Sequence, residues 1–457
     1  MNLADAFPEI MKRGGFDAIV GNPPYVRIQG SSSELIAYLS QRYVAARKNF
    51  DLYVPFLERG YSLLNKKGRV GMILPNKFFK TDYGENLRGF LSKQKSISQI
   101  VDFGASQVFA ATTYTCLLFL SKEHQDTFDY IQTEASTVAL NDLQFEIRKS
   151  EFLSNNTWMF GSEEVATIER KLEYNSKRLL DLPSEMSRGS SSGDDEVFVL
   201  GKGKSQVEKE ILRVPIFATD FGRFHFLPSR EWEIIFPYVS DGGKYRLYTE
   251  KELKGSFPKA YSYLREHQSK LQKRKQYSEW FGYSAPRNLD LHDKAQILVP
   301  LLADKGSFAF IPKTTQGKLC PMASGGFTIT LDKNSSLAPE YVLGLLNSHL
   351  LFWKLKRMSN LFRGGWITCT KQYFGELPID TINFTDPADK SRHDNIVKLV
   401  EQMLAAKERL AQSKTDSETH RLEAHCASLD RQIDAAVYEL YGLTEEEIKI
   451  VEGKEKS

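Results

Sequence analysis

The sequence predicts an α/β fold at the amino-terminal end of the chain, then a mixed α+β region, then a helical hairpin. Short apolar runs alternate with amphipathic segments over residues 1–122, and short strand-like segments with Gly- and Ser-rich turns fill residues 156–380. Two long amphipathic segments lie within residues 381–457. Because 457 residues exceed what one hydrophobic core supports, we expect separate domains, with residues 123–155 as a polar connector.

The composition excludes several protein classes. A hydrophobic fraction of 41% and a charged fraction of 26% are typical of ordered globular proteins. No apolar run approaches the roughly 18 residues that span a bilayer, and no signal peptide opens the chain. The four cysteines lie far apart without a CxxC pair, which argues against disulfides or a zinc site. We therefore expect a cytoplasmic protein without a metal ion or a membrane partner.

Four apolar segments in the first region predict strands, at residues 16–21, 69–76, 97–104 and 115–121. A helix is expected from Asp51 to Gly68 and a second around Leu87 and Leu91, because apolar residues fall on one face of each. Strands that alternate with helices indicate a parallel sheet with helices on both faces. The last two strands follow each other without a helix, so one of them should be antiparallel.

The residues Asn22-Pro23-Pro24-Tyr25 directly follow the first predicted strand, where ligands bind in such sheets. The two prolines restrict the backbone, so Asn22 and the Pro23 carbonyl should lie on a stiff, extended corner. Two hydrogen-bond acceptors there suit a planar amino group. Hydrogen bonds from both of its N–H groups direct the nitrogen lone pair toward an electrophile. Tyr25 offers a face on which a planar ring can stack. The alternative interpretation is a turn that merely ends the strand.

This segment resembles the amino-methyltransferases that use S-adenosylmethionine, whose motif is Asp/Asn/Ser-Pro-Pro-aromatic. The NPPY form is typical of N6-adenine DNA methyltransferases, and also of glutamine and some RNA methyltransferases. The resemblance implies a partial Rossmann-like methyltransferase sheet in which Asn22 and Pro23 hold the target amine. It also implies that Tyr25 stacks on a flipped-out base and that Asn22 and Pro24 contact the cofactor. Phe109 is the best match to the second aromatic wall of that family; the alternative is a core phenylalanine.

Two further elements of that family are expected before NPPY. They are a Phe-x-Gly-x-Gly-like loop after a first strand and an acidic residue after the next, and both hold the cofactor. Only 21 residues precede Asn22, and they contain neither element. We therefore expect an incomplete S-adenosylmethionine pocket and an unpaired sheet edge, in the carboxyl-terminal part or one half of a longer enzyme. An upstream polypeptide that carries the cofactor-binding half or a nuclease is an expected partner.

Residues 257–300 interleave basic and aromatic residues, which suits phosphate contacts combined with stacking against bases. Between residues 201 and 310 there are 19 Lys and Arg against 13 Asp and Glu, enough for a basic face. For any single cation, a solvated surface charge is the alternative interpretation. The region is therefore expected to contact DNA through several of these residues together.

The order of motifs from residue 156 onward resembles the TaqI-like target-recognition domain of type II restriction–modification methyltransferases. The matching segments are the Gly-Ser-Ser-Ser-Gly turn at 189–193, LRVPIFATDFGRFHF at 212–226, and residues 341–356 and 374–379. This resemblance implies sequence-specific double-stranded DNA as substrate. The residues expected to contact DNA are Arg188, Ser190, Arg223, Lys273, Arg274 and Arg287. ATDFGRF departs from the family pattern, since only Asp220, Arg223 and an aromatic residue remain, so the resemblance does not establish phosphate contacts in that segment.

The last region is expected to form two antiparallel amphipathic helices, over residues 393–412 and from residue 420. Gly442 suits a helix C-cap, and Thr444 with Glu447 suits a capping box for a final short helix. The histidines His393, His420 and His425 are expected to be surface residues rather than metal ligands.

Taken together, the residues and both resemblances predict site-specific N6-adenine methylation of DNA by S-adenosylmethionine in a restriction–modification system. An alternative is a DNA-recognition subunit without catalysis of its own, which delivers specificity to a partner. A third possibility is a non-functional remnant of a disrupted gene.

Overall fold

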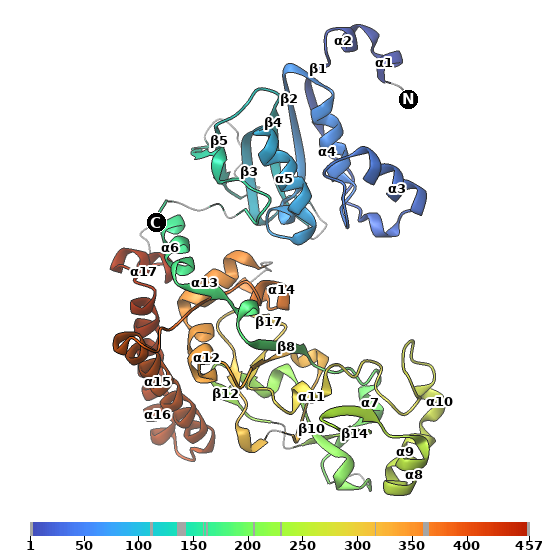
Figure 1. Ribbon diagram of the computed structural model, residues 1–457, viewed down its shortest axis with the longest axis vertical. Coiled ribbons are helices and arrows are strands. Elements are labelled where there is room, and N and C mark those ends of the chain that lie inside the picture. The colour runs from blue at the N-terminus through green and yellow to red at the C-terminus, as the bar shows by residue number, and fades with distance from the viewer. Residues whose placement is uncertain are drawn as a thin grey trace. The chain divides into compact units, whose positions relative to one another are not determined.

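The computed structural model describes residues 3–109, 113–134, 143–158, 160, 163–203, 206–228, 231–315, 317–359 and 365–454. The chain divides into two compact units, Met1–Phe160 and Gly161–Ser457. Figure 1 shows the elements of both units along the chain.

The first unit is built on a six-stranded sheet with the order β1-β2-β4-β3-β5-β6. β1 pairs with β2 and β3 with β5 in parallel, while β4 is antiparallel to both β2 and β3, as expected for one of the last two predicted strands. The strands are β1 (Phe16–Gly21), β2 (Leu64–Pro75), β3 (Ile97–Gln107), β4 (Tyr114–Ser121), β5 (Thr127–Gln132) and β6 (Glu146–Lys149). The helices are α1 (Leu3–Ala6), α2 (Pro8–Lys12), α3 (Ser33–Arg42), α4 (Tyr53–Ser62) and α5 (Glu85–Gln94).

Alternation along β2 explains how the helices pack on this sheet. Val70, Met72 and Leu74 are buried, and they share one core cluster with Leu57 of α4 and Leu87 of α5. The residues between them point to the opposite face and are only partly buried. The sheet therefore rests on α4 and α5 through one face.

The predicted end of the first helix, at Gly68, is wrong. α4 ends at Ser62, and Gly68 lies inside β2. A Cβ atom at Gly68 would lie 2.6 Å from the carbonyl oxygen of Phe16, so this glycine permits close approach of β1 and β2.

The first unit extends beyond residue 122, where the sequence placed its end, and includes most of the predicted connector. β5 and β6 continue the sheet because β3 has a second hydrogen-bonding edge that only a further strand can satisfy. Trp158 and Phe160 pack into the same core, the Phe160 ring stacking on Tyr130 at 4.4 Å. β5 alternates buried and less buried residues, but it has only six residues and β6 only four, so sequence periodicity alone did not reveal them.

The second unit contains two four-stranded sheets, with the orders β18-β16-β20-β8 and β19-β10-β13-β9. Their strands are β8 (Ser184–Arg188), β9 (Val199–Gly201), β10 (Leu212–Ile216), β13 (Trp232–Ile235), β16 (Ile297–Val299), β18 (Ala309–Phe310), β19 (Leu319–Pro321) and β20 (Phe327–Leu331). Short pairs are formed by β7 (Ser176–Arg178) with β22 (Pro378–Asp380), β11 (Phe221–Gly222) with β12 (His225–Phe226), β14 (Tyr238–Asp241) with β15 (Lys244–Leu247), and β17 (Leu302–Ala303) with β21 (Ile367–Thr368). The helices before residue 360 are α6 (Glu163–Tyr174), α7 (Asp195–Phe198), α8 (Glu250–Ser256), α9 (Pro258–Glu266), α10 (Gln268–Leu271), α11 (Leu289–His292), α12 (Pro339–Asn347) and α13 (His349–Met358).

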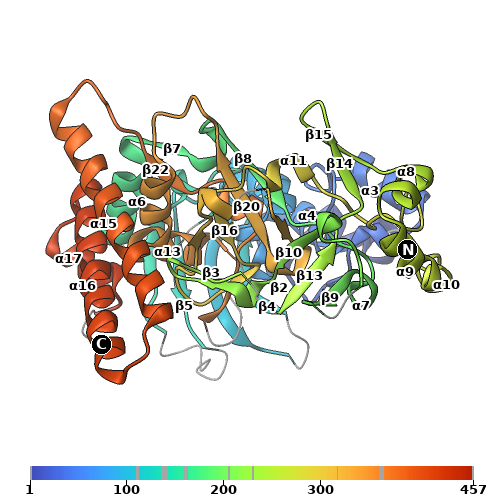
Figure 2. The same cartoon turned by 90° about the horizontal axis from the view of Figure 1, so that it is seen from below.

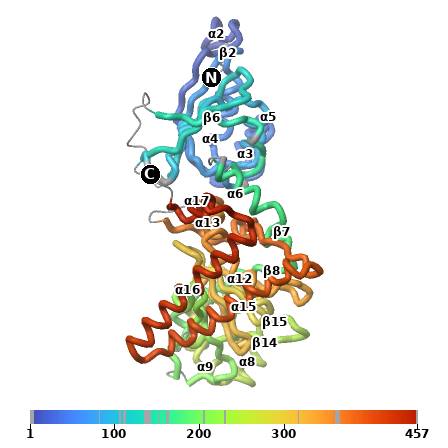
Figure 3. Tube along the Cα trace, turned by 90° about the vertical axis from the view of Figure 1, so that its left-hand side faces the viewer, coloured from blue at the N-terminus to red at the C-terminus, as the bar shows by residue number. Residues whose placement is uncertain are grey.

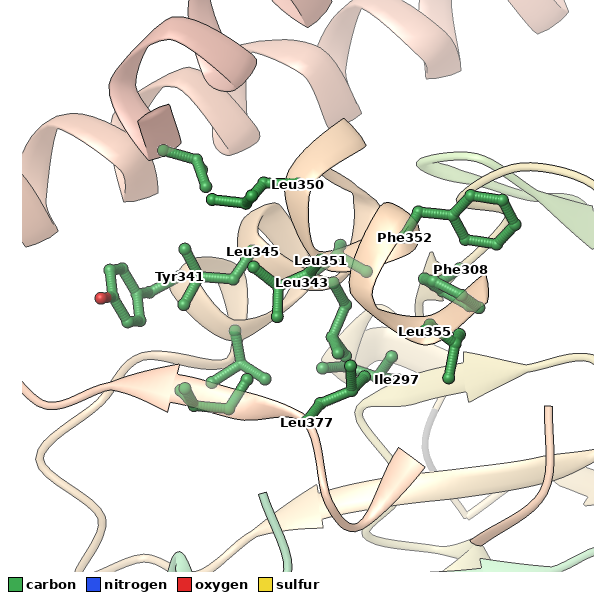
Figure 4. Close-up of a cluster of buried hydrophobic side chains, with 14 of the residues drawn as sticks. Ile297, Phe308, Tyr341, Leu343, Leu345, Leu350, Leu351, Phe352, Leu355 and Leu377 are labelled. Carbon is green, nitrogen blue, oxygen red and sulfur yellow. The ribbon is translucent and has the colours of Figure 1, made fainter. Parts of the chain in front are cut away.

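The largest core of this unit forms where α12 and α13 meet the strands, as Figure 4 shows for Leu351, Leu355, Ile297 and Leu377. A separate core, which includes Phe198, Tyr283 and Trp280, lies beneath the basic and aromatic segment predicted to read DNA. The α+β prediction for this region is confirmed by its short strands and interspersed helices.

The predicted helical hairpin is also present. After α14 (Lys371–Phe374), α15 (Pro387–Gln412) and α16 (Asp416–Leu440) run side by side, as Figures 2 and 3 show, and α17 (Glu445–Val451) follows. Thr444 and Glu447 form the predicted capping box, and Gly442 has a φ of 67°. His420 and His425 are exposed, but His393 is buried against Tyr341 and Phe384, so its surface assignment was wrong.

All four cysteines are buried free thiols. Among the helices of the described residues, none combines the length and apolar character that crossing a membrane requires. The same residues include no group of three or more His, Cys, Asp or Glu side chains positioned to hold a metal ion.

Candidate active site

The corner Asn22-Pro23-Pro24-Tyr25 follows β1 at the carboxyl end of the strand, where the sequence placed it. Asn22 and Pro24 are exposed, Pro23 is buried and Tyr25 is half-buried. β1 forms the edge of the sheet, with β2 as its neighbour, and Val20 next to the corner is 87% exposed. The polar atoms of Asn22 are therefore accessible from the side of β1 that faces away from β2.

The Tyr25 side chain is fixed at its hydroxyl. The hydroxyl donates a hydrogen bond of 3.0 Å to the carbonyl of Ile73 in β2, and burial raises the pKa of Tyr25 to about 12. The phenol therefore stays neutral and keeps this hydrogen bond across the physiological pH range. One edge of its ring meets Tyr53 at a centroid distance of 6.5 Å, which holds the ring in place.

Phe109 lies near Tyr25, as the motif comparison suggested. The ring centroids are 6.4 Å apart with an interplanar angle of 63°, and Phe109 is 36% exposed. A base sandwiched between two rings needs them roughly parallel. Insertion of a base would therefore require one of these rings to rotate, and the exposed ring of Phe109 has more freedom to do so.

A buried carboxylate near the ends of β2 and β3 was missed by the sequence analysis. Asp102 accepts hydrogen bonds from the Asn76 side-chain amide at 2.8 Å and from the backbone N–H of Gly104 at 3.0 Å. Burial raises the pKa of Asp102, and these hydrogen bonds oppose that shift. The Asn76 amide also donates to the Gly104 carbonyl, so the network ties the residue that follows β2 to two residues within β3. The only sequence signal was one polar residue after the second apolar strand and one within the third.

Asn22 and Pro24, the residues expected to contact a cofactor, are both exposed at the carboxyl end of β1. Among the described strands, β1 pairs only with β2, so its other edge is unpaired. The exposed polar atoms of the corner can accept hydrogen bonds from an amine.

In the second unit, the Gly-Ser-Ser-Ser-Gly turn is held by arginines that were predicted to contact DNA. The guanidinium of Arg274 donates to the carbonyls of Ser192, Gly282 and Trp280, at 2.6, 2.9 and 2.6 Å. Arg287 donates to the Gly189 carbonyl through its side chain at 3.1 Å and to the Ser190 hydroxyl through its backbone N–H. Ser190 is fully buried. These contacts give Ser190, Arg274 and Arg287 a role in shaping the turn.

Arg223 is likewise engaged within the second unit. Its guanidinium forms a bidentate ion pair with Asp430 of α16 and donates to the backbone carbonyls of Asn347 and Gly306. The Arg223 and Asp430 side chains are 16% and 28% exposed. This geometry gives Arg223 a structural role between β11–β12 and the helical hairpin.

Arg188 and Lys273 are exposed, unlike the other four predicted contacts. Arg188 ends β8 directly before the turn. Lys273 lies with Lys275 and the 36%-exposed Tyr277 on a loop whose base is fixed by the Arg274 hydrogen bonds. A rigid loop that carries cations and an aromatic ring is suited to contact nucleic acid.

Comparison with known proteins agrees with this geometry. Residues 1–109 match the family described as Eco57I restriction-modification methylase. The Type II restriction enzyme and methyltransferase RM.Eco57I of Escherichia coli is 29% identical over 419 residues, which cover 83% of this chain and 42% of the relative. The Type II methyltransferase M.BstVI of Geobacillus stearothermophilus is 25% identical, over 64% of this chain and 57% of the relative.

The chain is related to restriction-modification methyltransferases. It spans about half the length of these two relatives. The Type II methyltransferase M.XhoI of Xanthomonas vasicola matches 95% of the chain at 24% identity, with 76% of that relative covered.

A solved structure has a similar fold over nearly the whole chain. The Type IIL restriction-modification enzyme MmeI, solved in complex with DNA, matches with a TM-score of 0.61 and 13% identity, over 99% of this chain and 58% of that chain. The fold of both units, including the sheet that carries the NPPY corner, is thus one that restriction-modification enzymes use.

Proposed function

We propose that the chain carries the catalytic corner and the DNA-recognition part of a site-specific DNA methyltransferase that acts on the N6 amine of adenine. The observation that carries this proposal is the exposed Asn22-Pro23-Pro24-Tyr25 corner at the end of β1, with Tyr25 fixed beside Phe109. Its relatives are DNA-modifying restriction-modification enzymes, and the cytoplasm, where bacterial DNA lies, is the proposed place of action.

The chemistry of the corner follows from its acceptors. The Asn22 side-chain oxygen and the Pro23 carbonyl would accept the two N–H protons of the adenine amine, which localises the nitrogen lone pair for attack. An adenine inside a duplex cannot reach this corner, so the base must leave the helix and stack on Tyr25. Phe109 would close over the opposite face after rotating.

S-adenosylmethionine is the proposed methyl donor, and Asn22 and Pro24 are the contacts that this chain would offer it. Because these residues form one wall, the remaining contacts are proposed to come from a further segment. The unpaired edge of β1 favours such a segment, since an edge strand presents free N–H and C=O groups for pairing. Val20 and Phe56, which are 87% and 51% exposed, would be covered by it.

Recognition of double-stranded DNA is assigned to the second unit. Arg188 and the loop at residues 272–279 with Lys273 and Tyr277 are the proposed contacts, and the partly buried Arg274 and Arg287 hold these segments in position. Arg223 is proposed to support recognition indirectly, by fixing the helical hairpin.

A second candidate function is DNA recognition without catalysis. This candidate is favoured by the exposure of Asn22 and Pro24, because the described residues alone do not enclose a methyl donor. DNA binding without methyl transfer, even after the β1 edge is completed by an added segment, would support this alternative.

The test is transfer of a labelled methyl group from S-adenosylmethionine to unmethylated bacterial DNA. The purified chain is assayed alone and together with a polypeptide that carries the cofactor-holding segment of a relative. We expect incorporation in the second assay and little in the first. Binding of DNA with no incorporation in either assay would leave only the recognition function.

A further inference from the structure

We propose that the first unit has a phosphate-binding surface of its own, formed by Arg27, Arg47, Lys48 and Lys77 beside the Tyr25 corner. Its ligand is the sugar–phosphate backbone of the DNA strand that carries the target base. This inference rests on the proposed function. It places contacts to backbone phosphates on the first unit, whereas the sequence analysis expected phosphate contacts only in the second unit.

Arg27 is held close to the corner by backbone pairing. Immediately after Tyr25, the chain runs beside residues 50–52. The N–H of Ile28 donates to the Phe50 carbonyl at 3.1 Å and the N–H of Leu52 donates to the Val26 carbonyl at 2.8 Å. Arg27 and Asp51 lie opposite each other as an isolated antiparallel β-bridge, with these two backbone hydrogen bonds on either side. The exposed Arg27 side chain therefore starts from a fixed backbone position two residues after Tyr25.

The loop that carries Arg47 and Lys48 is also fixed. The carboxylate of Glu58, on α4, accepts hydrogen bonds from the N–H groups of Val44 at 2.9 Å and Ala45 at 2.8 Å. Ala45 and Ala46 are buried, so the loop is anchored before it reaches its two exposed cations.

These cations gather around residues 83–86. The Lys77 ammonium lies 5.3 Å from the centre of the Tyr83 ring, and the charge of Arg27 also acts on Tyr83, lowering its pKa against the larger effect of burial. The Lys48 ammonium lies 3.5 Å from the Glu85 carboxylate, and the Asn86 side chain donates to the Arg47 carbonyl at 3.4 Å.

The cluster is connected to the corner through a pair of tyrosines. The Tyr83 hydroxyl lies 3.2 Å from that of Tyr53, and the Tyr53 ring contacts the Tyr25 ring. The cations therefore lie on the segments that pack next to the Tyr25 corner, and the phosphates that flank a flipped base are proposed to pass over them.

The charges of this surface do not cancel. Lys77 pairs with Asp51 at 3.0 Å and Lys48 with Glu85. Within the part of the chain that the structure describes, no carboxylate pairs with the side chains of Arg27 and Arg47. Two exposed guanidiniums without an acidic partner suit phosphate oxygens, which guanidinium binds in a bidentate manner.

The test measures DNA affinity of the full chain by fluorescence anisotropy over a series of KCl concentrations. The probe is a duplex with one unpaired adenine, which lowers the cost of moving that base out of the stack whatever the recognition sequence. The test variant is R27Q/R47Q. The control is R13Q, because Arg13 is exposed in the same unit but precedes β1, about 20 Å of strand away from Asn22.

Each lost phosphate contact should make the slope of log K against log salt less steep by about 0.9, so we expect a change of about 1.8 for R27Q/R47Q and none for R13Q. If R27Q/R47Q keeps the wild-type slope while K273Q/K275Q reduces it, the surface is not a DNA contact and the proposed function stands. If the wild-type chain does not bind the probe at all, both are overturned. Equal thermal stability of the variants shows that the fold is retained.

Discussion

At the scale of single residues, Asn22 is the side chain on which the proposed chemistry depends most directly. It is exposed at the end of β1 and contributes one of the two acceptors for the amine. Its backbone position is set by the following prolines rather than by its own side chain. A substitution there should therefore change the reaction and leave the fold intact.

We predict that Asn22→Ala lowers methyl transfer in the completed enzyme by at least about 100-fold, the effect of removing one preorganised polar partner of a reacting group. DNA affinity should stay within about two-fold, because the predicted DNA contacts lie elsewhere. The measurements are labelled methyl incorporation and DNA anisotropy on the same preparations. A parallel loss of both activities would refute the assigned role.

Asp380 is a second residue with a measurable consequence. It is 6% exposed, and burial together with the nearby Asp389 raises its pKa to about 7. Because the folded state holds the proton more tightly than the unfolded state, the contribution of Asp380 to stability is lost as pH rises from about 4 to 7.

We predict that Asp380→Asn, which can keep the Asn175 contact, leaves the free energy of unfolding nearly unchanged at pH 4. At pH 8 it should raise that free energy by up to about 3 kcal/mol relative to wild type. Urea unfolding at both pH values checks this. A difference between the two proteins that does not grow with pH would show that the carboxyl is not neutral in the fold.

Three arginines of the second unit show what the sequence alone could not predict. The sequence predicted that Arg223, Arg274 and Arg287 contact DNA, but it could not distinguish a phosphate contact from hydrogen bonds within the protein. The distinction depends on partners distant in the chain, such as Asp430 for Arg223 and the Ser192 carbonyl for Arg274. Exposure, which follows from those partners, separates Arg188 and Lys273 from the rest.

At the scale of elements, the ion pair between Arg223 and Asp430 connects the turn of β11–β12 to α16. The same guanidinium donates to backbone carbonyls at Asn347 and Gly306. Removal of the cation would leave a partly buried carboxylate and two carbonyls without their donor, so the attachment of the hairpin should depend on it.

We predict that Arg223→Met lowers the free energy of unfolding of the second unit by about 2–4 kcal/mol. The matched control is Arg246→Met. Arg246 pairs with Glu252 on the surface, where both side chains are 40% or more exposed, and its loss should cost less than about 1 kcal/mol. Urea denaturation of the three proteins makes the comparison. Equal losses in both variants would mean that Arg223 does not clamp the hairpin.

The elements themselves were predictable to different degrees. β1, β3, β4 and the hairpin helices were recognised because their apolar periodicity is strong and local. β5 and β6 were not recognised, because each is short and is a strand chiefly through its pairing, β5 with β3 and β6 with β5, which periodicity does not report.

At the scale of the whole molecule, the chain has two units, and the proposed activity requires both. The first unit offers the amine-binding corner and the second offers the exposed cations and aromatic ring that suit DNA. The boundary near residue 160 lies later than the sequence suggested, since Trp158 and Phe160 complete the first core. The proposed order of functions along the chain rests on NPPY and the turn at 189–193, which are local motifs that the sequence shows directly.

The most direct measurement is the identity of the methylated nucleoside. DNA treated with S-adenosylmethionine and the completed enzyme is digested to nucleosides and examined by mass spectrometry, with the Asn22→Ala enzyme alongside. We predict N6-methyladenine from the wild type and a loss of at least about 100-fold from the variant. Methylation of cytosine instead of adenine, or N6-methyladenine at equal yield from Asn22→Ala, would contradict the assignment of this corner.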